Sequence, residues 1–112
     1  MNDFFEAVID GNYDSVKFMM DVGVSANDKD NEGKTYLIHA IENDHVSIAR
    51  ILIDYGANPE IGMTKTGETP LMAATRVKKW RLARALLEDG AMVNTRDFEG
   101  DTALIKAVGQ RL

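Results

Sequence analysis

The sequence predicts an all-α solenoid of stacked two-helix units, because the same residue types recur along the chain with one period. Glycines, threonines, leucines and alanines each recur at intervals of 33 or 34 residues within the 112-residue chain. A fixed period in this range is typical of helical repeat proteins, in which one supersecondary unit is copied along the chain. The recurring residues are Gly23, Gly56 and Gly90; Gly33, Gly67 and Gly100; Thr35, Thr69 and Thr102; Leu37, Leu71 and Leu104; and Ala7, Ala40, Ala74 and Ala107.

The first helix of each unit is predicted to begin at the recurring threonine. Its hydroxyl can accept a hydrogen bond from the unpaired backbone N–H groups at a helix start. In the third unit Pro70 follows Thr69, at a helix position where the missing N–H of proline costs nothing. One face of this helix is then apolar, consisting of Leu71, Ala74 and Thr75 in the third unit and of Leu37, Ala40 and Ile41 in the second.

The second helix of each unit is predicted to be amphipathic and to end at a glycine. Gly56 and Gly90 stand where a left-handed cap favours a residue without Cβ. Neither helix can bury its apolar face alone, so the units must stack. The apolar positions of the second helix are Ile48, Ala49, Ile51, Leu52 and Tyr55 in one copy and Leu82, Ala83, Ala85, Leu86 and Leu87 in the next.

One connection between units is a residue longer than the others. Gly33 follows Gly23 by ten positions, whereas Gly67 follows Gly56 by eleven. The extra residue therefore lies within residues 57–66. Connections run over the surface and accept such changes at little energetic cost.

Three segments resemble the ankyrin repeat family: Thr69-Pro70-Leu71-Met72-Ala73-Ala74, Leu86-Leu87-Glu88-Asp89-Gly90-Ala91-Met92-Val93-Asn94 and Asp97-Phe98-Glu99-Gly100-Asp101-Thr102-Ala103-Leu104. The resemblance implies a single domain of about three and a half helix-turn-helix repeats joined by hairpin-like loops. The repeats are expected at residues 1–28, 29–61, 62–95 and 96–112, with the last incomplete.

The chain departs from this family at two recurring positions, each in three of the four units. The family's histidine after the Thr-Pro-Leu triplet is replaced, and His39 falls one position too late to take its capping role. The glycine-histidine pair of the turn between the helices is also altered, so these turns are expected to be less ideal. The replacing residues are Ile38, Met72 and Ile105 for the histidine, and Gly11-Asn12, Asp44-His45 and Lys78-Lys79 for the pair.

The net charge of −5 argues against general binding to nucleic acid backbones. Residues 1–35 hold eight acidic side chains against three lysines and therefore carry the whole net charge. A basic run follows later at Arg76, Lys78, Lys79, Arg81 and Arg84. We expect either a solvated surface or a field that orients a partner.

Trp80 lies within this basic run, where an aromatic ring could stack on a nucleic acid base. Val46 and Tyr13 occupy the equivalent position of other units. This position is repeatedly large and apolar, so we interpret Trp80 as packing at a helix start.

The sequence contains no recognisable catalytic or cofactor-binding motif. There is no cysteine, no glycine-rich phosphate loop and no nucleophile elbow. His39 and His45 do not share a helical face and are interpreted as structural. Asp28, Asp30 and Glu32 lack the rest of a calcium loop and are expected to solvate a hairpin tip. We therefore expect a non-enzymatic protein with no cofactor and no metal.

The expected location is the cytoplasm. The N-terminus lacks the basic cluster and apolar run of a signal peptide. No apolar stretch approaches the length that spans a membrane. The absence of cysteine also fits a reducing compartment.

The resemblance implies a partner-binding surface made of the hairpin tips and the exposed side of the first helices. Phe98 at a tip could anchor a partner or pack against the neighbouring hairpin, and both alternatives stay open. Arg76 is the cation best placed to meet an acidic ligand. The residues expected to contact a partner are Asn31, Glu32, Lys34, Glu42, Asn43, Lys65, Thr66, Glu68, Arg76, Val77, Phe98, Glu99, Asp101 and Gln110.

The leading functional hypothesis is a scaffold or adaptor that binds another protein without chemistry of its own. The alternative is a regulatory or targeting module of a larger protein, enzymatic or not, that continues beyond Leu112. Apolar residues in the last predicted helix, including Leu104, Ile105 and Val108, favour a fourth unit that is completed by further chain or covered by another molecule. A third alternative is therefore self-association through this incomplete repeat.

Overall fold

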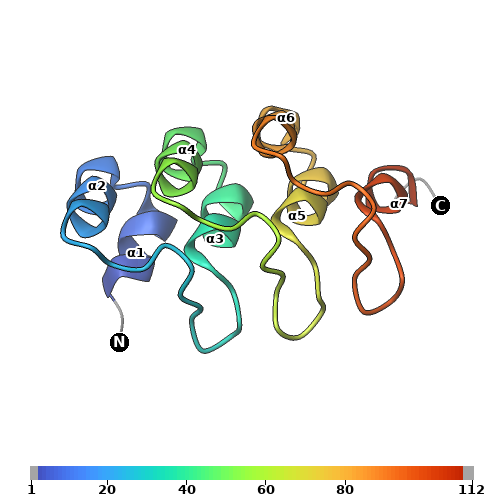
Figure 1. Ribbon diagram of the computed structural model, residues 1–112, viewed down its shortest axis with the longest axis horizontal. Helices are drawn as coiled ribbons and strands as arrows, with labels where there is room; N and C mark the ends of the chain where they lie inside the picture. Colours follow the sequence, from blue (N-terminus) through green and yellow to red (C-terminus); the bar gives the residue numbers. More distant parts are fainter. Residues whose placement is uncertain (1–2, 110–112) are drawn as a thin grey trace.

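A computed structural model describes residues 3–109, which form two parallel rows of helices (Figure 1). The inner row contains α1 (Asp3–Asp10), α3 (Tyr36–Glu42), α5 (Pro70–Arg76) and α7 (Ala103–Gly109). The outer row contains α2 (Tyr13–Asp21), α4 (Val46–Asp54) and α6 (Trp80–Glu88). Long loops connect each outer helix to the next inner helix and project from the inner row (Figure 1). Within residues 3–109 the only β-type pairing is the isolated antiparallel bridge between Lys29 and Thr35, which confirms the all-α prediction.

The inner helices begin at the positions that were predicted from the recurring threonines. Thr35 Oγ1 accepts a hydrogen bond from the backbone N–H of Ile38 at 3.3 Å, and Thr69 Oγ1 accepts one from Met72 at 3.4 Å. Pro70 is the first residue of α5. The capping prediction is confirmed, and it fixes the point at which each connecting loop turns into the inner row.

The outer helices end at the predicted glycines. Gly23, Gly56 and Gly90 have φ angles of 95°, 98° and 94°, a region that L side chains rarely adopt. No atom lies near the place where a Cβ would stand at these glycines. The left-handed backbone alone therefore explains why glycine occupies these positions.

The core lies between the two rows and between successive units. Leu37, Ile41, Leu52 and Leu82 are fully or almost fully buried, and Ala74 is completely buried where neighbouring inner helices approach one another. Each unit buries its apolar faces against its neighbours, which is why the stack has one continuous core. None of the described helices is both long enough and apolar enough to cross a bilayer.

Three side chains that were expected to pack are instead largely exposed. Trp80, Tyr55 and Leu87 each expose between about two fifths and a little over half of their surface. Trp80 is the first residue of α6 and Tyr55 follows the last residue of α4, so both face solvent at helix ends. Leu87 lies on α6, which has no further outer helix beside it in the described part of the chain. The packing interpretation of Trp80 is therefore wrong.

Backbone hydrogen bonds locate the extra residue of the long connection at the tip of its loop. Asp30, Met63 and Asp97 each donate a backbone N–H across the loop, to the carbonyls of Lys34, Glu68 and Asp101 respectively, and are therefore equivalent. Two residues lie between Asp30 and the tip glycine of its loop, and two between Asp97 and the tip glycine of its own loop. Three residues lie between Met63 and Gly67. The insertion lies among residues 64–66, and the helices on either side keep their register.

The turn between the two helices of a unit needs a left-handed residue, and two units supply it without glycine. Asp44 and Lys78 both have φ of 60°, whereas Gly11 fills the equivalent position with φ of 77°. A left-handed conformation costs a residue with a Cβ about 1–2 kcal/mol. The sequence-based expectation of less ideal turns agrees with this geometry.

Replacing Lys78 by glycine is expected to raise the free energy of unfolding by about 0.5–1 kcal/mol. Relief of the left-handed backbone outweighs the greater chain entropy of glycine in the unfolded state. Urea unfolding followed by circular dichroism measures the change. Lys78→Ala removes the same side chain without relieving the backbone, so equal stability of the two variants would contradict the explanation.

Candidate partner-binding surface

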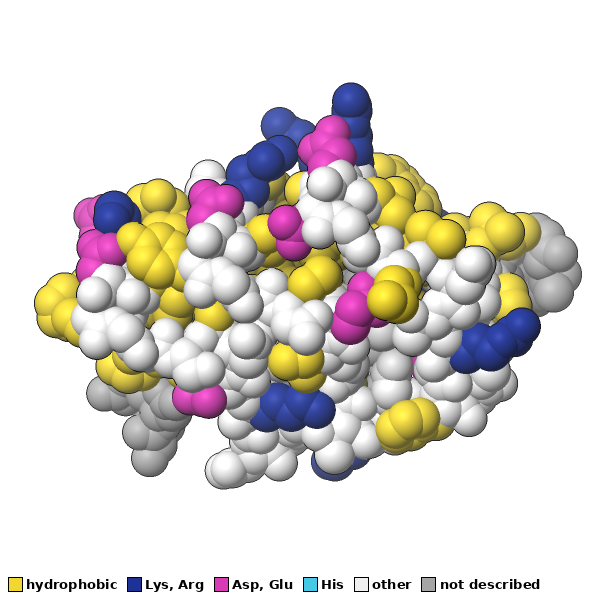
Figure 2. Space-filling model, viewed as in Figure 1, with side chains coloured by type: hydrophobic (Ala, Val, Ile, Leu, Met, Phe, Trp, Pro, Cys, Tyr) yellow, Lys and Arg dark blue, Asp and Glu magenta, His cyan; other side chains and the backbone are white. Residues whose placement is uncertain are grey.

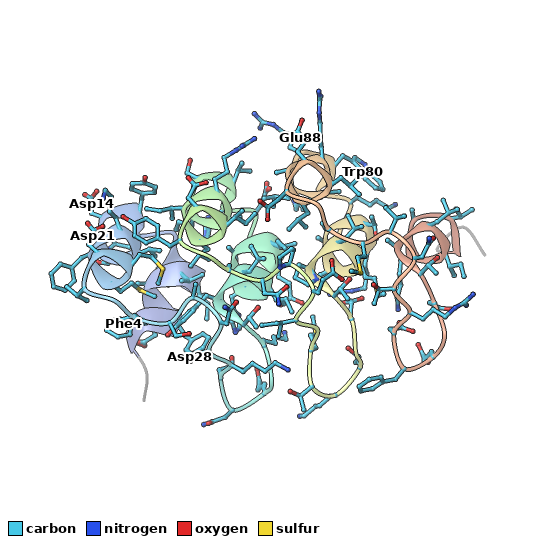
Figure 3. All side chains as sticks on the ribbon, viewed as in Figure 1. Phe4, Asp14, Asp21, Asp28, Trp80 and Glu88 are labelled. Carbon is cyan, nitrogen blue, oxygen red and sulfur yellow. The ribbon has the colours of Figure 1, made fainter. Side chains whose placement is uncertain are left out.

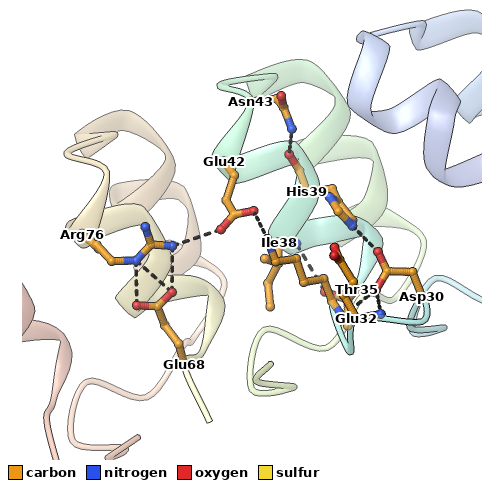
Figure 4. Close-up of polar contacts among 10 residues, drawn as sticks. Asp30, Glu32, Thr35, Ile38, His39, Glu42, Asn43, Glu68 and Arg76 are labelled. Atoms are coloured by element: carbon orange, nitrogen blue, oxygen red, sulfur yellow. Dashed lines mark hydrogen bonds and ion pairs between the residues drawn. The ribbon is translucent and has the colours of Figure 1, made fainter. Parts of the chain in front are cut away.

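A chain of ion pairs runs along the exposed side of the inner helices. Lys34 lies 2.9 Å from Glu42, and Glu42 lies 3.0 Å from the guanidinium of Arg76. Arg76 in turn holds Glu68 at 2.9 Å, with both carboxylate oxygens accepting hydrogen bonds from it (Figure 4). The chain continues to Lys106, whose Nζ lies 3.9 Å from Glu68. Inner helices of three consecutive units are thereby connected by alternating charges.

The alternation arises because consecutive units carry opposite charges at equivalent positions. Lys34 in the second unit corresponds to Glu68 in the third, and Glu42 corresponds to Arg76. Each unit forms its own pair, and the reversal of sign then attracts Glu42 to Arg76 across the boundary between units. If both units carried charges of the same sign at these positions, the side chains would repel one another across the boundary.

A second, more buried pair connects each of two loops to its inner helix. Asp30 lies 2.6 Å from His39 Nε2, and Asp97 lies 2.7 Å from Lys106 Nζ at the equivalent positions of the fourth unit. The third unit has Met63 and Ala73 there, so both polar partners are absent together. Replacing both partners by apolar groups avoids an unpaired buried charge.

Asp30 therefore has a structural role, and the expectation that it only solvates a hairpin tip is wrong. Its second oxygen accepts hydrogen bonds from the backbone N–H groups of Glu32 and Lys34 and holds the loop in shape. Burial acts to raise the pKa of Asp30, but the hydrogen bonds from Lys34, His39 and Glu32 outweigh it and lower that pKa. His45 is structural as well, with Nε2 2.9 Å from the carbonyl oxygen of Ile9.

The same balance applies to Asp97 and its partner. Burial acts to raise the pKa of Asp97, but hydrogen bonds from Lys106 and from the backbone of Asp101 and Glu99 lower it overall. The hydrogen bond to Asp97 is the main reason why the pKa of Lys106 is raised. Both groups stay charged at neutral pH, so the loop and α7 are held by a full ion pair.

Phe98 combines the two alternatives left open by the sequence. Its ring lies against Gly67 of the neighbouring loop, since a Cβ at Gly67 would stand only 2.6 Å from the ring. Its backbone N–H donates to the carbonyl of Thr66 at 2.9 Å. The side chain nevertheless remains 72% exposed. Phe98 is thus held in place by one loop while its outer face is open to a partner.

A concave groove of about 530 Å³ lies beside the ion-pair chain, between the loops that lead into α5 and α7. We call these the third and fourth loops, because they belong to the third and fourth units. We call the groove the central groove. Eight of the predicted contact residues line it, together with Met63, Asp97 and Lys106, which the sequence analysis did not select. The eight predicted residues are Lys34, Glu42, Lys65, Thr66, Glu68, Arg76, Phe98 and Glu99.

The other predicted contact residues lie elsewhere. Asn31 and Glu32 line a separate groove described below, and Asp101 lies in the fourth loop near Lys106. Asn43 and Val77 are the C-cap residues that follow α3 and α5. Gln110 lies outside the described residues.

Arg76, which the sequence indicated as the cation best placed to meet an acidic ligand, already forms ion pairs within the protein. Its guanidinium is engaged by Glu68 and Glu42, and the hydrogen bonds to Glu68 are the main reason why the pKa of Arg76 is raised. Glu68 is itself buried, with 6% of its side chain exposed. These two residues form the floor of the central groove, and the exposed residues at its rim are Lys65, Thr66, Phe98 and Glu99.

A second groove of about 640 Å³ lies at the N-terminal end of the same row. We call it the N-terminal groove. Phe5, Glu6 and Ile9 of α1 form one side, and residues 29–32 of the loop that leads into α3 form the other. Phe5 stacks on Tyr36 with ring centroids 4.1 Å apart, which fixes this wall against α3.

Three carboxylates of the fourth loop lie close together but already have a cation. Ligand oxygens of Asp97, Glu99 and Asp101 lie within 4.8 Å of one another. The ammonium of Lys106 is 2.7 Å from Asp97 and 3.8 Å from Asp101. It supplies the positive charge that a metal ion would otherwise bring, so this cluster is explained by the fold.

The arrangement so described is that of a helical-repeat protein with its loops and inner helices on one concave side. Comparison with known proteins then gives the family. A family model comprising three copies of the ankyrin repeat matches residues 4–97, and the chain belongs to the ankyrin repeat family. Ankyrin repeats are generally protein–protein interaction modules, and the family is typically non-catalytic.

Individual relatives are much longer than this chain. An ankyrin repeat-containing protein of Treponema pallidum (strain Nichols) is 36% identical over 108 residues, covering 96% of this chain and 36% of that protein. BRCA1-associated RING domain protein 1 of Caenorhabditis elegans is 32% identical over 83 residues, covering 74% of this chain and 12% of that protein. The human neurogenic locus notch homolog protein 4 is 47% identical over 57 residues, covering 51% and 3% respectively. The chain thus spans about a third or less of the length of these relatives.

Proposed function

We propose that the chain is a non-catalytic, cytoplasmic scaffold that binds a segment of another protein in the central groove. The observation that carries the proposal is the position of Phe98, an exposed ring held at the rim of a concave groove. Aromatic side chains at such places are typical anchors of protein interfaces. The predicted contact residues at the rim, Lys65, Thr66 and Glu99, would surround this anchor with polar contacts.

The floor of the groove supports this proposal because it is rigid and electrically balanced. Lys34, Arg76 and Lys106 are matched by Glu42, Glu68 and Asp97 within the ion-pair chain. A partner therefore meets a preformed surface and does not have to order these long side chains on binding. We propose that the rim residues provide most of the affinity for the partner, and that the ion-paired floor sets the shape of the groove.

Replacing Phe98 by alanine is expected to weaken capture of a partner from the source cell at least about tenfold, because an interface anchor is lost. The measurement is affinity capture with the wild-type chain as bait, followed by quantitative mass spectrometry. Phe18→Ala is the matched control, since Phe18 is an equally exposed phenylalanine on the outer helix α2. Equal recovery of the same proteins by both variants would remove Phe98 from the binding surface.

A second candidate function is a regulatory or targeting module within a larger assembly, and the exposed face of α7 favours it. Leu104 is 71% exposed, whereas the equivalent Leu37 and Leu71 are 1% and 3% exposed. Ile105 and Val108 are also exposed, although Ile38 and Ile41 at their positions are fully buried. In earlier units an outer helix lies beside these positions, so we propose that α7 is covered by a further helical unit or by a second copy.

Sedimentation velocity separates the two ways of covering α7. If a second copy covers it, the chain forms a dimer whose fraction rises with concentration, and Leu104→Glu abolishes the dimer. Leu87→Glu is a matched control on the exposed side of α6. A chain that stays monomeric at all concentrations excludes self-association and leaves the further helical unit.

A further inference from the structure

The N-terminal groove differs from the central groove in its charge. Glu6, Asp30 and Glu32 line it, against Lys29 alone. The central groove, in contrast, is lined by four cationic and four anionic side chains. The inner row therefore offers one balanced groove and one acidic groove, which lies in the part of the chain that carries the whole net charge.

Two of the four charged side chains of the N-terminal groove are available to a ligand and two are engaged within the protein. Asp30 is occupied by His39, and Lys29 Nζ donates to Thr64 Oγ1 at 2.9 Å on the next loop. Glu6 and Glu32 are exposed, and neither side chain forms an ion pair among the described residues. They belong to opposite walls of the groove, so a cationic group between them would meet a carboxylate on either side.

Apolar surface lies beside these two carboxylates. Ile9 of α1 lines the groove and is 38% exposed, and Phe5 forms its base in contact with Tyr36. Figure 3 shows Phe4 and Asp28 at this end of the molecule. Apolar surface next to free carboxylates matches a peptide in which basic and apolar side chains alternate.

We infer that the N-terminal groove binds a basic segment of a partner protein, with a lysine or arginine between Glu6 and Glu32 and an apolar side chain against Ile9. The inference rests on the proposed function and adds the chemistry of the partner. It also gives a direction to the complex, since the basic part of the bound segment lies at α1 and the remainder continues toward Phe98. An acidic segment would be repelled at α1 and accepted only further along the row.

The test uses two synthetic peptides and the isotopically labelled chain, observed by two-dimensional NMR. Acetyl-Arg-Leu-Arg-amide is expected to cause saturable shifts in the amide signals of residues 5–9 and 29–32. Acetyl-Glu-Leu-Glu-amide is expected to leave those signals unchanged. Shifts of equal size with both peptides, or shifts centred on the outer helices, would overturn the inference.

Charge reversal at the groove gives the decisive comparison. In the double variant Glu6→Lys and Glu32→Lys, the dissociation constant of the basic peptide is expected to rise at least about tenfold. The double variant Asp14→Lys and Asp54→Lys changes the net charge equally on exposed positions of α2 and α4, and a rise of less than about twofold is expected there. Equal losses in the two variants would show that only the overall charge matters and would defeat the proposal.

The outcomes for the two grooves can be told apart. If the Glu6 and Glu32 variant binds the basic peptide as the wild type does while Phe98→Ala still loses its captured partner, the present inference fails and the proposed function stands. If Phe98→Ala has no effect while the basic peptide binds at residues 5–9 and 29–32, the proposal that the central groove binds the partner is rejected. Circular dichroism confirms that each variant keeps its helical content.

Discussion

Replacing Arg76 by alanine is expected to lower the free energy of unfolding by about 2 kcal/mol. The substitution leaves Glu68 buried without its bidentate partner and removes the ion pair with Glu42, which connects α5 to α3. Breaking a fully buried pair costs about 3–5 kcal/mol. A smaller value is expected here because the Arg76 side chain is 38% exposed and water screens its charge.

Arg84→Ala is the matched control for this prediction. Arg84 is 81% exposed and pairs with Glu88 one helical turn away on the outer helix α6. Exposed pairs of this kind contribute about 0.3–0.5 kcal/mol. Urea unfolding of both variants, followed by circular dichroism, measures the difference. If Arg76→Ala is no more destabilising than Arg84→Ala, the ion-pair chain does not stabilise the contact between units.

The second large effect is expected at Lys106. Its replacement by alanine leaves Asp97, whose side chain is 2% exposed, charged and without its cation. A loss of about 2–3 kcal/mol is expected, because a buried charge without a partner is strongly destabilising. The double variant Asp97→Met and Lys106→Ala reproduces the residues found naturally at Met63 and Ala73, so it is expected to recover at least half of the loss. A double variant as unstable as Lys106→Ala would contradict this equivalence.

The pH dependence of stability provides an independent check on the same pair. The pKa of Asp97 is lowered in the folded chain, so its contribution is complete above the ordinary pKa of aspartate near 4 and is lost as pH falls through the lowered value. The pKa of Lys106 is raised, so its contribution is complete below about 10.5 and is lost as pH rises through the raised value. The wild type should therefore lose more stability below pH 4 than the double variant does.

The sequence was sufficient to predict the stacking of the units because glycine and threonine act locally. A glycine that ends an outer helix and a threonine that begins an inner one depend on their own backbone angles and hydrogen bonds, as at Gly56 and Thr69. Such positions recur in three of the four units, whatever packs around them. The assigned repeat boundaries at residues 28, 61 and 95 stay predictions.

The polar contacts of the groove could not be predicted in the same way because they depend on pairs of residues in different elements. The pair of Asp30 and His39 becomes Asp97 and Lys106 in another unit, so a search for one repeated residue type misses it. A usable signal was present in Glu42, whose equivalent Arg76 has the opposite charge. Opposite charges at one position of consecutive units predict an ion pair between neighbouring inner helices.

Burial was the least predictable property at the ends of helices. Trp80 shares its position with Tyr13 and Val46, and a large apolar residue in every unit suggested a packed site. Trp80 and Tyr13 are exposed, since the first residue of an outer helix lies at the border between core and solvent. Basic side chains also gather over α4 and α6 at the top of the face shown in Figure 2.

The insertion at residues 64–66 has a consequence for engineering this chain. It lengthens one loop beyond the hydrogen bond between Met63 and Glu68, and the helices on both sides keep their places in the stack. This loop therefore already contains one additional residue, and the helical scaffold is unchanged by it. Short recognition sequences inserted between Thr64 and Thr66 would project from a fixed base, so new binding specificities can be selected at this tip while the helical framework is left untouched.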